Sequence, residues 1–174
     1  MSALERSMRV LARIGLALAA LALLASLLAI GYSVVMRYVF GAPLTWTDEL
    51  VGYLLVASVM LAAPDALLEG EHISVDIVTE RLAARGRKIA YLLGLAAVAA
   101  TALLLLVEGL RTVEFSRMVG LRSNGYFALP LWLPQLLIPA GALLLLLAAL
   151  VAFLRGLREG APQREGTMPP AGLE

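Results

Sequence analysis

The sequence contains no cysteine and a single histidine, His72, among its 174 residues. Without cysteine the chain cannot form a disulfide scaffold, a cysteine zinc site, an iron–sulfur centre or a thiol nucleophile. One histidine cannot supply both axial ligands of a haem, and a lone histidine is a poor metal site. We therefore expect no cofactor on this chain.

Charged residues are also scarce. They make up 16% of the chain, whereas apolar residues make up 61% and the mean hydropathy is +0.88. Soluble domains have about 25% charged and about 45–50% apolar residues, so the composition argues against a soluble fold. It equally excludes a disordered chain, which is polar and highly charged. The net charge of +1 gives no reason to expect nucleic acid as a partner.

Four long apolar stretches predict a small multi-spanning membrane protein. The expected spans cover about residues 14–36, 50–68, 89–112 and 131–154. The first has 23 uncharged residues, which as a helix reach about 35 Å and cross a hydrocarbon core of about 30 Å. The stretches are continuously apolar rather than alternating, which excludes a β-barrel. The expected fold is an all-α integral membrane protein, with a four-helix membrane domain over residues 14–154.

The basic residues predict the orientation. Ten of the 14 lie before the first stretch, between the second and third, or after the fourth. The positive-inside rule then places both termini in the cytoplasm, with a basic tail over residues 1–13 and a disordered tail over residues 155–174. The first stretch exceeds the roughly 7–15 apolar residues of a signal peptide, so we expect an uncleaved first helix.

The segment His72–Lys88 is too charged to span. Its apolar residues Ile73, Val75, Val78 and Leu82 recur at roughly helical spacing. Asp76 falls in the first turn of such a helix, where the helix dipole favours negative charge. The pattern predicts a short amphipathic helix on the cytoplasmic interface, in contact with membrane lipids.

Few charged residues fall inside the expected spans. Asp65 follows Pro64 near the cytoplasmic end of the second span, and we expect it to reach water there. Glu108 and Arg111 are three residues apart near the outer boundary, which predicts a local ion pair. The first, third and fourth spans have no carboxylate near their middle, which argues against an ion path through this chain alone. No Ser-His-Asp arrangement or phosphate-binding loop is recognisable, so we do not expect an enzyme.

The outer loop between the first two spans is rich in polar and aromatic residues. It contains Arg37, Trp46, Asp48 and Glu49, and most aromatic residues of the chain, including Trp132, fall on the same side. Two interpretations remain open: an aromatic belt that anchors the protein, or an ordered cap that packs against a partner. In either case we predict that Arg37 pairs with Asp48, with Glu49 or with an acidic group of a partner.

Three motifs resemble the small membrane subunit of tripartite ATP-independent periplasmic (TRAP) transporters. They are Arg37-Tyr38-Val39-Phe40 followed by Pro43 and Trp46-Thr47-Asp48-Glu49-Leu50; Gly70-Glu71-His72-Ile73-Ser74-Val75-Asp76; and Leu129-Pro130-Leu131-Trp132 followed by Ile138-Pro139-Ala140-Gly141. The resemblance covers roughly Tyr32 to Leu147. The resemblance implies interface or structural roles for Arg37, Trp46, Asp48, Glu49, His72, Asp76, Trp132 and Pro139.

The resemblance also implies a location, the bacterial inner membrane, and a function. In that family a periplasmic binding protein captures the substrate, often an organic acid, and a large multi-spanning permease subunit carries the substrate and sodium sites. The small subunit is a non-catalytic scaffold for the large one. The alternative hypotheses are a self-sufficient four-span transporter or channel, for which the spans lack charge, and a membrane enzyme, which would need clustered His, Asp or Cys.

Overall fold

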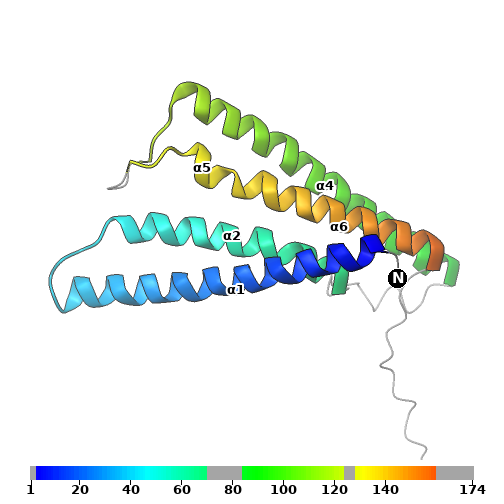
Figure 1. Ribbon diagram of the computed structural model, residues 1–174, viewed down its shortest axis with the longest axis horizontal. Helices are drawn as coiled ribbons and strands as arrows, with labels where there is room; N and C mark the ends of the chain where they lie inside the picture. The colour runs from blue at the N-terminus through cyan, green and yellow to red at the C-terminus, as the bar shows by residue number, and fades with distance from the viewer. Residues whose placement is uncertain (1–2, 70–83, 124–127, 160–174) are drawn as a thin grey trace, which may run out of the picture.

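The computed structural model describes residues 3–69, 84–123 and 128–159. These residues form five helices (Figure 1): α1 (Ala3–Tyr38), α2 (Trp46–Glu69), α4 (Ala84–Val119), α5 (Trp132–Gln135) and α6 (Leu137–Glu159). Helices α1, α2 and α4, and α5 together with α6, are long and apolar enough to cross a membrane. The predicted all-α class with four spanning helices is therefore confirmed.

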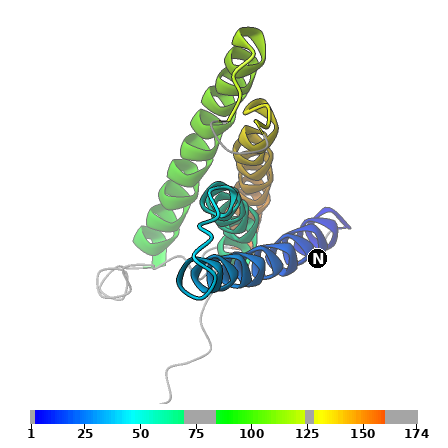
Figure 2. The same ribbon diagram turned by 90° about the vertical axis from the view of Figure 1, so that its left-hand side faces the viewer.

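The helices pack in the order α1–α2–α6–α4. Helices α1 and α2 form one antiparallel hairpin, α4 and α6 form a second, and α2 packs on α6. Viewed end-on, α1 and α4 lie at the two edges of this array (Figure 2). We call the end with the connections 39–45 and 120–131 the loop end, and the end with the start of α1 and the finish of α6 the tail end. The two hairpins converge at the tail end and diverge at the loop end (Figure 1).

The middle of α2 lies directly against a glycine of each neighbouring helix, α1 and α6. A Cβ on Gly141 of α6 would lie 2.4 Å from the Cβ of Met60, and a Cβ on Gly15 of α1 would lie 2.7 Å from the carbonyl oxygen of Leu61. Pro64 lies four residues after Met60 and lacks the N–H that would bond to its carbonyl. Close approach through small residues is the usual way in which membrane helices pack, so these contacts fix the position of α2.

An apolar cluster fills the tail end. It joins all four long helices through Met8, Leu67, Leu95, Ala148, Ala149 and Ala152. Nearby, the Lys88 ammonium donates a hydrogen bond of 2.8 Å to the carbonyl oxygen of Leu157, which satisfies one of the last carbonyls of α6. A Cβ on Gly156 would lie 2.8 Å from the ring of Tyr91. The prediction of a disordered tail from residue 155 is thus wrong for Arg155–Glu159, because these contacts extend α6 to Glu159.

The other expected boundaries shift in a similar way. Helix α1 begins at Ala3, so the described part of the basic tail is helical. Helix α4 begins at Ala84, so the last residues of the predicted amphipathic helix are the first of α4, and the rest of that helix lies outside the described residues. The fourth span is interrupted at Leu136, between α5 and α6, because Pro139 has no N–H for the carbonyl of Gln135.

The connection at the loop end is short and ordered near α4. Gly120 ends α4 with a positive φ of 68°, and the amide of Leu121 donates to the carbonyl of Ser116, 3.0 Å away. This is the Schellman ending that glycine favours. A two-rung ribbon follows: the Ser123 amide donates to the Leu129 carbonyl at 2.8 Å, and the Leu131 amide donates to the Leu121 carbonyl at 3.0 Å. The ribbon leads the chain back to α5.

Candidate functional site

The polar residues at the loop end tie α2 to the ribbon after α4. The Tyr53 hydroxyl donates a hydrogen bond to the Glu49 carboxylate one turn earlier on α2. The Ser123 hydroxyl on the ribbon also forms hydrogen bonds with the side chains of Glu49 and Tyr53. We call Glu49, Tyr53 and Ser123 the clasp. It joins the two hairpins at the end where their helices diverge.

Two members of the clasp were not predicted from the sequence. Tyr53 could have been found, because residues four apart lie on the same side of a helix and their side chains meet. Ser123 is 74 positions from Glu49 in the sequence, and no local pattern brings the two together. Glu49 itself was predicted as a polar anchor of this loop, but with a different partner.

A second set of polar contacts joins α1 to α2 next to the connection 39–45. The Thr47 hydroxyl lies 3.0 Å from the Ser33 hydroxyl and 3.0 Å from the Leu44 carbonyl oxygen, and forms a hydrogen bond with each. Thr47 and Ser33 are 1% and 7% exposed, so this bond is shielded from solvent and lipid. It holds the loop end of the α1–α2 hairpin.

Arg37 and Asp48 line an open cavity of about 370 Å³ beside this bond, together with Ser33 and Thr47. Both charged residues are exposed. In the part of the chain that the structure describes, Arg37 forms no ion pair with Asp48 or Glu49. The predicted bridge within the chain is therefore wrong, because the Glu49 carboxylate is turned toward Tyr53 and Ser123. A pair between Arg37 and an acidic group of a partner stays a prediction.

The remaining expected residues are divided among the elements. Trp46 begins α2 and is half-buried. The Arg117 guanidinium of α4 lies 6.0 Å from the ring centre of Trp132 on α5, at the outer limit of a cation–π contact. Pro139 packs against Gly109 of α4, where a Cβ would lie 3.1 Å from the proline Cδ. These contacts position α5 and α6 against α4.

His72 and Asp76 lie outside the described residues, so their roles stay predictions. For the described ranges, no group of three His, Cys, Asp or Glu side chains is placed to hold a metal ion.

Asp65 was expected to reach water, but it does not. It is 3% exposed, because α2 is enclosed by α1 and α6 at this level and Pro64 and Leu67 beside it are buried as well. Sequence position near a helix end was therefore a poor guide to its exposure.

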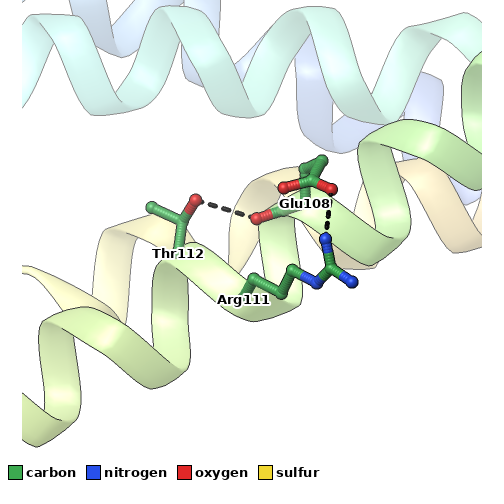
Figure 3. Close-up of polar contacts among 3 residues, drawn as sticks. All are labelled: Glu108, Arg111 and Thr112. Carbon is green, nitrogen blue, oxygen red and sulfur yellow. Dashed lines mark hydrogen bonds and ion pairs between the residues drawn. The ribbon is translucent and has the colours of Figure 1, made fainter.

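Glu108 and Arg111 form the predicted ion pair on α4 (Figure 3). The guanidinium Nη1 of Arg111 lies 2.8 Å from the carboxylate Oε1 of Glu108. The Arg111 side chain is 70% exposed and the Glu108 side chain is 63% exposed. The Thr112 hydroxyl donates to the Glu108 carbonyl at 2.8 Å. All three residues are exposed, so this polar group faces away from the rest of the array.

Comparison with known proteins gives the family. No curated protein sequence matches the chain. Residues 26–159, which include α2, α4, α5, α6 and the second part of α1, match the family model described as the DctQ component of tripartite ATP-independent periplasmic transporters. The match takes in the three motifs on which the resemblance was based. Together with its four membrane-spanning helices, this shows that the chain is a multi-pass membrane protein of the DctQ family, the small permease component of TRAP transporters.

Proposed function

We propose that this chain is a non-catalytic scaffold, which holds a large permease subunit in place during sodium-coupled import of a small organic acid. Membership of the DctQ family is the observation that carries the proposal, because a tripartite transporter requires partner subunits. The sodium and substrate sites would then belong to the large subunit, and a periplasmic binding protein would deliver the substrate.

The distribution of charge supports a scaffold rather than a transport path. An ion path needs charged or polar groups that face a cavity within the membrane. The uncharged segment of α1 runs from residue 14 to residue 36 and that of α4 from 89 to 107. Glu108 is already paired with Arg111 on the outside of the array. We therefore do not assign Glu108 as a ligand of the coupling ion. Nor do we assign Asp65, which belongs to no group of three His, Cys, Asp or Glu side chains among the described residues.

The packing of the helices supports the same role. Four helices in an open array expose large apolar surfaces on both edges, and α4 is the least buried of the four. A surface of this kind suits a protein that widens another membrane protein by lying beside it, since packing rather than the hydrophobic effect drives helix association in lipid.

We place the loop end in the periplasm and both termini in the cytoplasm. At the tail end lie Arg6, Arg9 and Arg13 of α1, Arg85, Arg87 and Lys88 of α4, and Arg155 and Arg158 of α6. This excess of positive charge fits the cytoplasmic side. The absence of native cysteine allows a direct test. In intact cells stripped of their outer membrane, a membrane-impermeant maleimide should label Val39→Cys and not Leu157→Cys. The reverse result would overturn this orientation.

Reconstitution tests the function itself. Liposomes that contain this chain alone should show no sodium-driven uptake of an organic acid. Liposomes with the chain, its large permease subunit and the binding protein should take up substrate, and omission of the small chain should abolish or strongly reduce uptake. Uptake by the small chain alone would reject the scaffold and favour a self-sufficient transporter. Full uptake without it would also reject the proposal.

A further inference from the structure

The cavity beside Arg37 lies at one boundary of the membrane. The uncharged segment of α1 has 23 residues and ends at residue 36. As a helix it reaches about 35 Å, slightly more than the hydrocarbon core. Arg37 is the next residue, so its guanidinium lies at the level of the lipid headgroups. Ile30 is two turns earlier, about 10 Å deeper. Both residues line the cavity, which therefore extends from the headgroups into the lipid tails.

The deeper part of the cavity is apolar. It is lined by Ile30 and Val34 of α1 and by Val51 of α2. Ile30 and Val34 are close to half exposed, and both belong to the uncharged segment of α1. A ligand that covers them must therefore present apolar surface at this depth, as an acyl chain does. The volume of about 370 Å³ is within the usual range for a small-ligand site.

The shallow part of the cavity carries two opposite charges. Arg37 is in the last turn of α1 and Asp48 is in the first turn of α2, where the helix dipoles favour a cation and an anion respectively. Both side chains line the cavity and are exposed. Among the described residues, neither of them forms an ion pair. The cavity therefore offers a ligand one cationic donor and one anionic acceptor.

The two hydroxyls that line the cavity have no hydrogen left for a ligand. A carbonyl oxygen can only accept, so the Thr47 hydroxyl donates its hydrogen to the carbonyl of Leu44. The Ser33 hydroxyl must then donate to the Thr47 oxygen. A further hydrogen bond to either hydroxyl oxygen has to come from a donor on the ligand. Both hydroxyls therefore favour a ligand that carries N–H or O–H groups.

One class of membrane component combines these features. A phosphate accepts hydrogen bonds from a guanidinium, and a primary ammonium has three donors for a carboxylate and for hydroxyl oxygens. In a phosphoethanolamine lipid the two groups belong to one headgroup, with acyl chains on its deeper side. A small soluble zwitterion would leave the apolar wall uncovered. A lipid with phosphate but no cation would place its negative charge beside Asp48 without a partner for that carboxylate.

We propose that the cavity between α1 and α2 binds a phosphoethanolamine phospholipid, with its phosphate on Arg37, its ammonium on Asp48 and one acyl chain along Ile30 and Val34. The inference rests on the cavity and on the membrane-spanning helices, and it does not depend on the proposed scaffold role. It gives Arg37 a lipid phosphate as its partner, in place of an acidic group of another subunit.

Lipid titration of the purified full-length chain tests the specificity. Native mass spectrometry counts the lipids bound at increasing concentrations of phosphatidylethanolamine, phosphatidylcholine or phosphatidylglycerol. The choline headgroup has no N–H, and the glycerol headgroup has no cation. We expect the first phosphatidylethanolamine to bind about tenfold more tightly than either of the other lipids, as one additional hydrogen bond between charged groups would give. Equal affinities for the three lipids would overturn the inference.

Two variants in the same titration test the roles of the charged residues. Arg37→Gln should weaken the binding of phosphatidylethanolamine by about tenfold or more. Asp48→Asn should remove most of the preference over phosphatidylcholine. Arg122→Gln is the matched control, because Arg122 is an exposed arginine at the same end of the molecule that does not line the cavity. Equal losses from Arg37→Gln and Arg122→Gln, or a preference fully retained in Asp48→Asn, would overturn the inference.

Photocrosslinking in membranes that contain the complete transporter distinguishes a lipid from a protein occupant. The probe is phosphatidylethanolamine with a diazirine near the start of one acyl chain. Mass spectrometry of the digested chain should find adducts on the segment with Ile30 and Val34. Their yield should fall severalfold in Arg37→Gln and stay unchanged in Arg122→Gln. The absence of adducts on this segment would mean that a protein covers the cavity and would overturn the inference, as would an equal yield from Arg37→Gln and the unaltered chain.

Discussion

The tail half and the loop end of the molecule are held together by opposite means. From the middle of α2 to the tail end, the helices meet through glycine, alanine and leucine, and backbone lies directly against backbone at Gly15 and Gly141. At the loop end the hairpins diverge, and the contacts between them include the hydrogen bonds of Ser123 with Glu49 and Tyr53. We infer that the first region sets the global stability, whereas the second sets only the local position of the loop-end ribbon.

The largest effect should come from the backbone contact between α6 and α2. Gly141→Leu places a side chain where the Cβ alone would lie 2.4 Å from Met60, and neither backbone can move without disturbing the other helices. We expect a loss of about 3 kcal/mol or more, seen as a large fall in the thermal midpoint in detergent and as aggregation. Gly31→Leu is the control, because a Cβ there meets nothing within 4 Å. Equal effects from the two variants would contradict the comparison.

An intermediate effect should come from the buried bond between α1 and α2. Thr47→Val keeps the shape of the side chain but leaves the Ser33 hydroxyl without its partner. We expect a loss of about 1–2 kcal/mol, measured by thermal unfolding. The double variant with Ser33→Ala should lose less than the sum of the two single changes, because the unpaired group is then removed. Strict additivity would show that the two hydroxyls do not act together.

The smallest effect on global stability should come from the clasp. Ser123→Ala removes the bond from the ribbon to Glu49, and we expect an unchanged thermal midpoint. Hydrogen exchange at the amides of Ser123 and Leu131 should become faster, because the ribbon loses its attachment to α2. Thr112→Val is the control, since it removes only a bond within α4. A large fall in the midpoint for Ser123→Ala would mean that the loop end contributes to the global fold.

Much of this architecture follows from the sequence, but not the order of the helices. Uninterrupted apolar stretches predict the four spans because lipid demands helices of that length. The packing of α2 on α6 depends on Gly141 and Met60, which lie 81 positions apart in the sequence. Glycine in an apolar stretch signals some close contact but does not identify the partner.

The candidate site shows the same limit. The ion pair between Glu108 and Arg111 was predicted correctly, because a spacing of three residues on one helix brings the two side chains together. Arg37 and Glu49 belong to different helices, and nearness in the sequence across the connection 39–45 did not bring their side chains together. The burial of Asp65 likewise depends on where α1 and α6 pack. The residues next to Asp65 in the sequence do not indicate that arrangement.

The backbone contacts at Gly15, Gly141 and Gly109 have a consequence for the surrounding bilayer. Bare backbone pressed against a neighbouring helix resists sliding, so the levels of the four long helices relative to one another are fixed. The array therefore behaves as one solid body with a set hydrophobic thickness. In a thinner or thicker membrane, either the whole array changes its tilt or the bilayer deforms around it, since single helices cannot adjust alone. Any protein bound along the edge of the array would lean with it, which makes the lipid composition of the membrane a determinant of how the assembled transporter sits.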